Sequence, residues 1–415
     1  MTSTETPAPP IGGFVAPGYE EVERVFRKNF DDGKELGAGY AAYVDGKLVV
    51  NLYGGWADEA KTKSFTDSSL TNIWSSGKAV LGVTVAHCVS KGLFSYSDPV
   101  SKYWPEFGAG GKENVLIKDL CQHTAGVAWL DDAHLPTIAD LADLDALAKK
   151  IAGQPHNFGG EYQKIYHAVT QGWFLNEVVR RVLGTSHGDF FKSTVNKSLG
   201  VDVYCGFPTE LEDRYAPVVL TKELIEGLVA NAPKDKTEPR AKVGATMPKG
   251  YTTANDPELR KGETPAAFTV SNAKSVARLM ALCSMGGALD GVNLIDEATL
   301  KASIELDPRA QGVVDLNLQY ATQSCVGGTS WVRSPDGFRV PAEFPPEYAK
   351  GSGWQWQGWY GFGGSHAQFD LGNHTSSAYV MNLMQPMRGA DNRGTDLALA
   401  LTKCVDAVRG AAGSA

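Results

Sequence analysis

Runs of residues with strand character lie at both ends of this chain, and helical patterns fill the middle. Near the N-terminus, Asp45-Gly46 separates the β-prone runs AGYAAYV and KLVVNLYGG, which is a strong signal for a hairpin turn. Near the C-terminus, Leu371-Gly372-Asn373 separates GGSHAQFD from TSSAYVMNLM in the same way. Two distant hairpins are buried most economically in one shared sheet. We therefore predict an α/β (α+β) fold in which both chain ends form one antiparallel sheet with flanking helices, beside a mostly helical middle domain.

Helical periodicity and polar stretches set the domain boundaries that we expect. Helices are predicted over roughly 19–30, 74–93, 166–183, 273–283 and 394–408. Residues 232–265 are rich in Lys, Glu, Pro, Asp and Gly and are typical of a long exposed loop. We expect a disordered leader at 1–13 and a helical domain at 74–265 that contains this loop. The sheet domain is expected to be discontinuous and to consist of 14–73 and 266–415.

The composition excludes several classes of protein. The 415 residues carry a net charge of −8 and no basic block, which argues against nucleic acid or an anionic membrane as a partner. The longest apolar run, Val80–Val89, is too short to cross a bilayer, and the first residues lack the basic and apolar regions of a secretory signal. We therefore expect a cytoplasmic protein without a membrane partner.

Cysteine and histidine spacing gives no sign of a metal or a disulfide framework. The six cysteines are far apart and form no CxxC pair, so we expect buried, reduced thiols. The eight histidines show no HExxH or HxH spacing. We expect no metal and no cofactor.

The first chemical motif is Ser75-Ser76-Gly77-Lys78, at the expected start of a helix after strand-like residues. Residues i and i+3 share a helix face, so Ser75 and Lys78 should lie together. A buried lysine with a lowered pKa can take the proton of a serine hydroxyl, and the helix N-terminus favours an oxyanion. This pattern is typical of serine–lysine nucleophilic catalysis.

Two other serines match catalytic motifs, and the local pattern favours a structural role for both. Ser271 is also followed by a lysine at i+3, but we interpret it as the N-cap of the next helix. Ser186 fits GxSxG, which requires a preceding strand. An amphipathic helix precedes it instead, so Gly184 is interpreted as a C-terminal helix glycine and Ser186 as a cap.

An ordered set of motifs follows Ser75. DPVSKYWPEF and LCQHTAGV come first, then YHAVTQGW with Tyr166, 91 residues after Ser75, and WYGFGGS with Trp359, a further 193 residues on. Over roughly residues 18–410 the chain resembles the class C β-lactamase and penicillin-binding-protein superfamily, and within it the family VIII carboxylesterases. WSSGK corresponds to the SxxK motif of that superfamily, and the other two segments occupy its Tyr motif and its Lys-Thr-Gly or His-x-Gly strand.

The resemblance implies roles for individual residues. Ser75 would be the nucleophile, and Lys78 and Tyr166 would form the base that activates it and later activates water. The backbone N–H groups of Ser75 and Phe362 would form the oxyanion hole. Which of Lys78 and Tyr166 holds the proton in the free enzyme stays open, because the two would titrate as a coupled pair. His123, in the HTAG-type segment, is expected to support the site.

Two departures from the lactamase pattern indicate the substrate class. Ala168 stands where lactamases have Asn, and Trp359 stands where they have the Lys that attracts the lactam carboxylate. A neutral indole offers apolar surface and one N–H donor instead. We therefore predict a serine carboxylesterase acting on small-molecule esters with short or medium acyl chains. The substrate-binding residues that we expect are Trp354, Trp356, Trp359, Tyr360 and Gly361.

Other functions stay open at this stage. A β-lactamase, a D-amino peptidase or an acyltransferase would use the same Ser-Lys-Tyr set. A non-catalytic scaffold homologue would be expected to have lost part of that set, which is intact here. The sequence leaves the oligomeric state open.

Glycines concentrate around the third motif, at Gly351, Gly353, Gly358, Gly361, Gly363 and Gly364. Glycine is needed where backbone approaches another group closely or takes unusual dihedral angles. We expect this strand to approach the reacting atoms through its backbone. Gly77 is expected to leave space beside Ser75.

Overall fold

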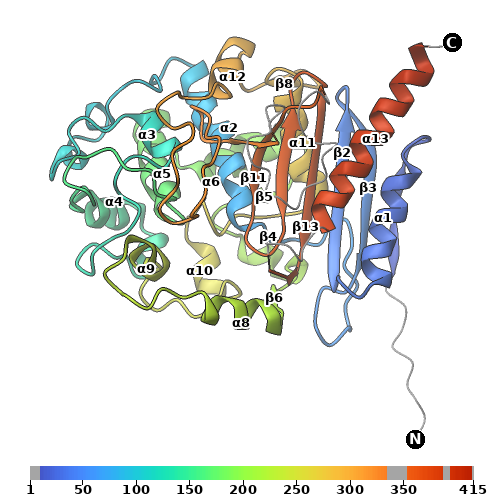
Figure 1. Cartoon of the computed structure of the whole chain (residues 1–415), viewed down its shortest axis with the longest axis horizontal. Coiled ribbons are helices and arrows are strands. Elements are labelled where there is room, and N and C mark those ends of the chain that lie inside the picture. The colour runs from blue at the N-terminus through green and yellow to red at the C-terminus, as the bar shows by residue number, and fades with distance from the viewer. Residues whose placement is uncertain (1–9, 334–352, 387–392, 414–415) are drawn as a thin grey trace, which may run out of the picture.

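The computed structural model describes residues 10–333, 353–386 and 393–413 (Figure 1). Within these ranges, the large sheet contains seven strands: β1 (Ile11–Val15), β2 (Gly37–Val44), β3 (Lys47–Gly55), β10 (Ser330–Arg333), β11 (Trp356–Tyr360), β12 (His366–Asp370) and β13 (Thr375–Met381). The short strands are β4 (Thr71–Asn72), β5 (Val203–Tyr204), β6 (Val219–Leu220), β7 (Val270–Ser271), β8 (Ala288–Leu289), β9 (Val292–Asn293) and β14 (Leu383–Met384).

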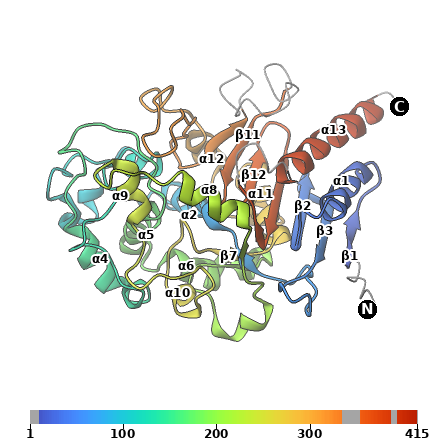
Figure 2. The same ribbon diagram turned by 60° about the horizontal axis from the view of Figure 1, so that its bottom comes forward.

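Most of the helices lie in the middle of the chain, between the two groups of strands that form the large sheet. They are α1 (Glu20–Asp31), α2 (Gly77–Ser90), α3 (Ile117–Cys121), α4 (Leu144–Ala152), α5 (Thr170–Leu183), α6 (His187–Phe190), α7 (Asn196–Leu199), α8 (Lys222–Ala230), α9 (Pro239–Ala245), α10 (Pro257–Lys261), α11 (Ala273–Ser284), α12 (Glu297–Ser303) and α13 (Arg393–Gly413). Figure 2 brings α8, α9 and α10 toward the viewer, with α8 in the centre of the view.

The large sheet joins the two ends of the chain. Its spatial order is β1-β3-β2-β13-β12-β11-β10, and every neighbouring pair is antiparallel. The N-terminal hairpin therefore lies beside the C-terminal hairpin, with Tyr40 of β2 opposite Tyr379 of β13. This arrangement confirms the predicted fold class.

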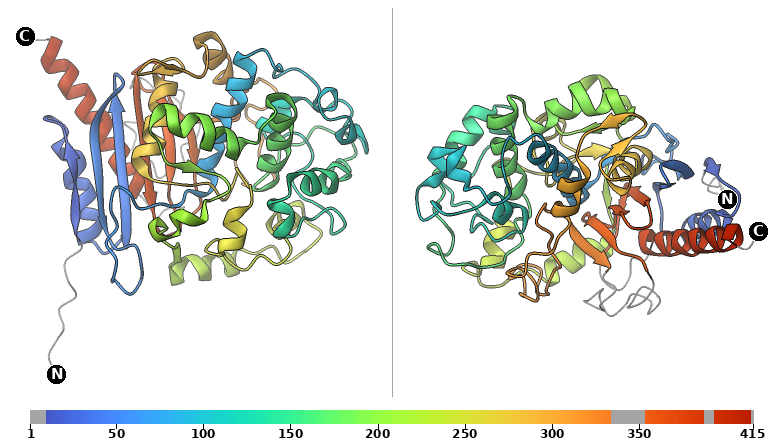
Figure 3. Two further views of the ribbon diagram at one scale, coloured as in Figure 1. Left: turned by 180° about the vertical axis from the view of Figure 1, so that it is seen from behind. Right: turned by 90° about the horizontal axis from the view of Figure 1, so that it is seen from above.

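Helices cover both faces of the sheet, which explains why β2 and β13 are buried along their whole lengths. Successive side chains of a strand point to opposite faces. Accordingly, Tyr40 and Ala42 of β2 belong to the cluster that contains α1, whereas Ala41 and Tyr43 belong to the cluster that contains α11. The views in Figure 3 show α1 and α13 together on the outer side of the sheet, with the helical part beyond the other side.

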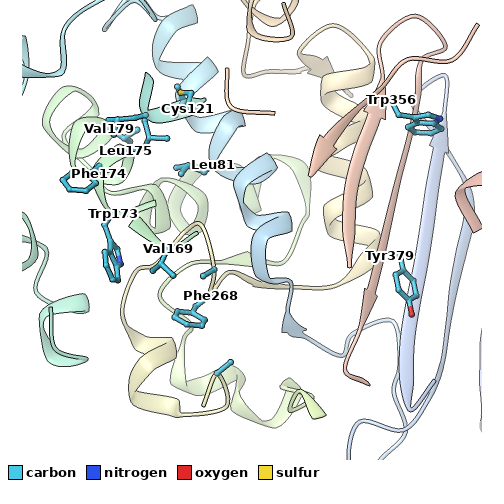
Figure 4. Close-up of a cluster of buried hydrophobic side chains, with 14 of the residues drawn as sticks. Leu81, Cys121, Val169, Trp173, Phe174, Leu175, Val179, Phe268, Trp356 and Tyr379 are labelled. Atoms are coloured by element: carbon cyan, nitrogen blue, oxygen red, sulfur yellow. The ribbon is translucent and has the colours of Figure 1, made fainter. Parts of the chain in front are cut away.

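Helix α2 runs between the sheet and the middle helices. Ten of its fourteen residues are buried, which fits a helix covered on all sides rather than an amphipathic one. It packs against α5 on one side and against β11 and β12 on the other. Figure 4 shows Leu81 of α2 facing Trp173 and Phe174 of α5, while Trp356 and Tyr379 lie on the sheet. The first turn of α2 is thus held at the junction of the two parts.

Three expectations about local structure were wrong in part. The expected leader was too long: residues 1–9 lie outside the described residues, but Ile11–Val15 pairs with β3. The helix expected from Tyr166 begins at Thr170, so Tyr166 lies in an irregular segment before it. Residues 232–265 are not one exposed loop, because they contain α9 and α10 and bury groups such as Leu259 and Arg260. The predicted domain boundaries remain a prediction.

The predictions for two helices and for the burial of the cysteines are confirmed. Helix α11 spans Ala273–Ser284 and the last helix spans Arg393–Gly413, close to the predicted ranges. All six cysteines are buried and free. Over the described ranges, no helix combines the length and the apolar character that crossing a membrane requires.

Candidate active site

The candidate nucleophile lies in a turn between β4 and α2. The 3₁₀ turn η1 covers Trp74–Ser76, and α2 follows at once from Gly77. Trp74 has a φ of +49°, a left-handed conformation that is uncommon for a bulky residue. Such strain persists only where the surroundings fix it, and it is frequent at functional sites. The turn leaves the side chain of Ser75 partly exposed, while Ser76 is fully buried.

Lys78 lies one helical turn after Ser75, and its Nζ is 3.4 Å from Ser75 Oγ. The amine donates hydrogen bonds to the carbonyl oxygens of Ala168, at 2.7 Å, and Ala266, at 2.9 Å. No carboxylate forms an ion pair with it among the described residues. Burial alone lowers the pKa of Lys78 well below its ordinary value. Burial thus favours the neutral form of this amine, which lies beside a serine hydroxyl.

Tyr166 completes the set from the opposite side of Ser75. Its hydroxyl donates to Ser75 Oγ at 2.7 Å, and the Lys78 amine lies 4.7 Å from the centre of its ring. Burial raises the pKa of Tyr166, although hydrogen bonds with Ser75 and Trp359 act in the opposite direction. Tyr166 is therefore a protonated phenol that donates to the serine oxygen. The structure brings together all three residues that the sequence proposed as catalytic.

Two aromatic side chains fix the ring of Tyr166. Trp359 stacks on it, with centroids 5.6 Å apart and planes 15° apart, and His123 contacts it edge to face at 4.8 Å. The N–H of His167 donates to His123 Nδ1 at 3.3 Å, so the proton of the neutral imidazole is assigned to Nε2. Burial lowers the pKa of His123 well below its ordinary value, so it stays neutral. His123 and Trp359 both contact Tyr166, and the substrate contact expected of Trp359 remains a prediction.

The C-terminal end of β11 docks onto the nucleophile turn. Ser365 Oγ donates to the carbonyl oxygen of Ile73 at 2.8 Å and lies 3.1 Å from Ser76 Oγ. The rings of Trp74 and Phe362 meet edge to face at 5.4 Å. In the described part of the chain, the N–H groups of Ser75 and Phe362 have no hydrogen-bonding partner. These contacts place both proposed oxyanion donors in neighbouring turns.

Glycine is required at 361 because backbone and side chains meet there. A Cβ at this position would overlap with Ser365 Oγ and with the carbonyl oxygen of Ile73. Gly363 and Gly364 have positive φ values of 84° and 122° and complete the turn. The expected close approach of this strand is therefore present. Gly77, by contrast, faces Pro265 and Thr269 rather than the space beside Ser75.

We predict that Gly361→Ala will lower kcat/KM by about 10²-fold, because the methyl group must push the strand carrying Phe362 away from Ser75, and loss of one oxyanion donor has this magnitude. Hydrolysis of p-nitrophenyl acetate measures the effect. Gly227→Ala is the matched control, because a Cβ on Gly227 in α8 meets nothing within 4 Å. Equal activity of both variants would contradict the docking of β11 described above.

Three of the expected pocket residues lie away from the site. Trp354 and Trp356 stack on each other with centroids 5.4 Å apart and are buried, and the Trp354 indole donates to Asp406 of α13 at 3.2 Å. Tyr360 contacts His366 on the same face of the sheet. Strand β11 alternates, so these side chains face α13, whereas Trp359 faces Tyr166. The prediction that Trp354, Trp356 and Tyr360 line the pocket was wrong, and Gly351 lies outside the described residues.

The two other candidate serines have structural partners. Ser186 caps α6 by accepting from the N–H of Asp189, and its hydroxyl donates to the buried Glu263 at 2.5 Å. Gly184 ends α5 in the left-handed conformation, as predicted. The hydroxyl of Ser271 donates to the carbonyl oxygen of Asp202 at 2.6 Å. The expected cap role of Ser271 was wrong, because Asn272 caps α11.

Some groups of the site could not be found from sequence motifs. The carbonyl oxygens of Ala168 and Ala266 orient Lys78, but any residue type supplies a carbonyl. Asp315 accepts the backbone N–H of Tyr166 at 3.0 Å from a segment 149 residues away. None of these three groups has a local sequence signal, because each depends on a contact between distant segments.

A serine hydroxyl held between a buried lysine amine and a tyrosine hydroxyl, on a sheet built from both chain ends, defines a serine hydrolase of the β-lactamase-like fold. Residues 22–402 match the family described as Beta-lactamase. The chain belongs to the Beta-lactamase family and is a hydrolase.

Similar proteins include both esterases and penicillin-binding-protein homologues. The chain is 28% identical over 292 residues to Esterase/beta-lactamase LipL of Mycobacterium tuberculosis, covering 69% of this chain and 67% of that protein. It is 24% identical over 217 residues to Esterase EstB of Burkholderia gladioli, covering 47% and 53%.

Solved structures show the same mixture. A penicillin-binding protein homologue from Caulobacter crescentus has a TM-score of 0.81 at 30% identity, over 95% of this chain and 100% of that chain. A family VIII carboxylesterase has a TM-score of 0.78 at 27% identity, again over 95% and 100%.

Proposed function

We propose that this protein is a serine carboxylesterase that hydrolyses short- to medium-chain carboxylic esters through an acyl ester on Ser75. The observation that carries the proposal is the position of Ser75 Oγ, which lies 3.4 Å from the Lys78 amine and 2.7 Å from the Tyr166 hydroxyl. Relatives and structural neighbours described as an esterase/β-lactamase, an esterase and a family VIII carboxylesterase support an ester substrate.

Lys78 is the proposed proton acceptor of the first step. A neutral amine has two N–H donors and one lone pair, and the carbonyl oxygens of Ala168 and Ala266 take both donors. The lone pair is then left for the proton of Ser75. As Ser75 Oγ bonds to the ester carbon, its proton moves to Lys78 Nζ, and the negative charge on the carbonyl oxygen is held by the N–H groups of Ser75 and Phe362.

Tyr166 is the proposed proton donor to the leaving group. When the C–O bond of the tetrahedral intermediate breaks, the alcohol oxygen takes the phenolic proton, and the Lys78 ammonium returns its proton to Tyr166. Water then attacks the acyl-Ser75 ester and gives one proton to the same pair. The Ser75 oxygen regains its proton as the acid leaves, which restores the free enzyme.

We expect kcat/KM to fall as the pH is lowered through the depressed pKa of Lys78, because an ammonium cannot accept the proton of Ser75. We expect no loss of activity at the ordinary pKa of tyrosine, because burial raises the pKa of Tyr166. Rates with p-nitrophenyl acetate from about pH 5 to about pH 10 check both limbs, with the spontaneous hydrolysis subtracted. An alkaline loss of activity below the ordinary pKa of tyrosine would contradict the assignment of Tyr166 as the protonated partner.

Trp359 favours esters over β-lactams in this proposal. It presents an indole rather than a cation beside Tyr166, so a substrate carboxylate gains no charge partner from it. We therefore expect ester hydrolysis to exceed nitrocefin hydrolysis.

The test of the proposal is a panel of p-nitrophenyl esters from acetate to laurate, measured beside nitrocefin and with Ser75→Ala as the blank. A maximum at short or medium chains with weak nitrocefin turnover is the expected result. A preference for laurate, or faster turnover of nitrocefin than of every ester, would overturn it. Release of p-nitrophenol that accelerates with an added alcohol, with formation of the new ester, would identify an acyltransferase instead.

A further inference from the structure

Tyr166 lies in a segment that is neither helix nor strand, so no regular element fixes it in place. Helix α5 begins only at Thr170. The segment instead forms hydrogen bonds with distant parts of the chain: the N–H of Ile165 donates to the carbonyl oxygen of His123 at 3.0 Å, and the N–H of Tyr166 donates to Asp315 Oδ1 at 3.0 Å. The position of the phenolic hydroxyl therefore depends on these partners.

The carboxylate of Asp315 is built into the fold as an acceptor. Its Oδ1 also accepts the N–H groups of Asn317 and Leu318, each at 2.9 Å. The neighbouring backbone is fixed to the same segment, because the N–H of Leu316 donates to the carbonyl oxygen of Lys164 at 3.0 Å. Asp315 has no exposed surface, and its Oδ2 has no hydrogen-bond partner among the described residues.

A buried carboxylate is costly unless several donors satisfy it. One oxygen of Asp315 accepts three N–H groups, and the other accepts none among the described residues. The carboxylate thus joins the N–H of Tyr166 to the turn at 315–318. The charge of Lys164 acts on this carboxylate, but the Lys164 amine donates instead to the carbonyl oxygens of Ala310 and Thr322, each at 2.9 Å.

We propose that Asp315 is a positioning residue of the acyl-transfer site, which acts through the backbone N–H of Tyr166 to keep the phenolic hydroxyl on Ser75 Oγ. This inference rests on the proposed catalytic role of Tyr166. The hydrogen bonds that the Asp315 side chain forms among the described residues go to the N–H groups of Tyr166, Asn317 and Leu318 and not to Ser75. In this proposal Asp315 sets the backbone position of Tyr166, and through it the contacts of the tyrosine ring with Trp359 and His123.

Two substitutions of Asp315, to asparagine and to alanine, should differ in their effect on kcat. Asp315→Asn keeps an Oδ1 that accepts the same three N–H groups, and its amide nitrogen replaces an oxygen without a partner among the described residues. Asp315→Ala removes the acceptor. We expect Asp315→Asn to keep kcat within about threefold, and Asp315→Ala to lower kcat by about 10- to 100-fold with little change in KM, as for a displacement of about 1 Å at a catalytic group.

The matched control is Asp307→Ala. Asp307 is a buried aspartate in the same segment that binds the N–H and side chain of Arg309 and pairs with Lys118, and it makes no contact with Tyr166. Its loss should lower thermal stability without a specific fall in kcat. Circular dichroism and melting temperature establish which variants are folded.

The decisive measurement is a double-mutant cycle between Asp315→Ala and Tyr166→Phe. If Asp315 acts only through Tyr166, its substitution will cost kcat in the wild type and nothing further in the Tyr166→Phe background. Asp315→Ser, whose shorter side chain cannot reach all three N–H groups, replaces the alanine variant if alanine does not fold. Equal kcat for wild type and Asp315→Ala, a loss in Asp315→Asn as large as in Asp315→Ala, or full additivity in the cycle would overturn the inference.

A second measurement, the rate of covalent labelling, tests the role of Asp315 independently of the proposed ester substrate. The rate at which an organophosphonate labels Ser75 requires an activated serine but no ester turnover. Labelling that slows in Asp315→Ala and not in Asp307→Ala supports the inference even if every ester tested is a poor substrate. A wild-type enzyme that labels rapidly but hydrolyses no ester would contradict the proposed substrate class alone.

Discussion

Replacing Ser75 by alanine will lower kcat/KM for p-nitrophenyl ester hydrolysis by roughly 10⁴- to 10⁶-fold, the range seen when a serine hydrolase loses its nucleophile. The structure gives the reason: Ser75 Oγ is the one atom that lies within reach of both the Lys78 amine and the Tyr166 hydroxyl among the described hydrogen bonds. The fold should not change, because Ser75 is partly exposed and the substitution removes a single oxygen.

The controls for this prediction are the two other motif serines. Ser186→Ala and Ser271→Ala should keep kcat near the wild-type value and lower the melting temperature instead. Each removes a buried hydroxyl and leaves its partner, the Glu263 carboxylate or the carbonyl oxygen of Asp202, without that donor. A catalytic loss in either variant that matches Ser75→Ala would contradict the assignment.

Lys78→Met is the second substitution with a large expected effect, and we predict a loss of kcat of roughly 10³- to 10⁵-fold. The methionine side chain has a similar length but carries no amine, so Ser75 loses its proton acceptor. Removing a proton-transfer group from a site typically costs about 10²- to 10⁴-fold, and more where it acts as a unit with the nucleophile. The pH dependence assigned to Lys78 should disappear from the residual activity.

Lys112→Met is the matched control for this experiment. Lys112 is a second fully buried lysine whose amine donates to two carbonyl oxygens, those of Ala152 and Gln154. Burial lowers its pKa to about 8, and it lies under Phe107 rather than beside Ser75. We expect it to affect stability and not kcat. Full activity of folded Lys78→Met would show that Lys78 is not the proton acceptor. Equal losses of kcat in both variants would show that the loss comes from removing a buried amine and not from losing proton transfer to Lys78.

Elements defined by nearby residues were predictable from the sequence. The Asp45-Gly46 turn and the alternation on either side gave the N-terminal hairpin, and α11 was correct to within a residue. The sheet that joins the chain ends followed from burying both hairpins together. Ser75, Lys78 and Tyr166 could be grouped through the ordered motifs, because each motif keeps its own residue type and order.

Groups that depend on distant partners were not predictable. The pattern of residues 232–265 is polar, yet Arg260 is buried because Glu212 pairs with it at 2.6 Å and the ring of Tyr215 lies beneath its guanidinium. Composition cannot show such a partner. Likewise, Tyr166 lies before the start of α5 at Thr170, and its N–H binds a carboxylate, Asp315, that lies far along the chain.

The wrong prediction for Trp354 and Trp356 has a simple structural reason. Trp356 and Trp359 are three positions apart in one strand, so alternation requires that they face opposite sides of the sheet. Only one of the two could therefore line the site. The position of α13, which covers Trp354 and Trp356, decides which one it is.

Covalent labelling with an organophosphonate, followed by peptide mapping of wild type and Ser75→Ala, tests the central assignment most directly. The serine activated by Lys78 and Tyr166 should attack the phosphorus and keep the adduct. We expect one adduct, on the peptide that contains Ser75, and none in the alanine variant. An adduct on Ser186 or Ser271, or labelling that persists in Ser75→Ala, would contradict it.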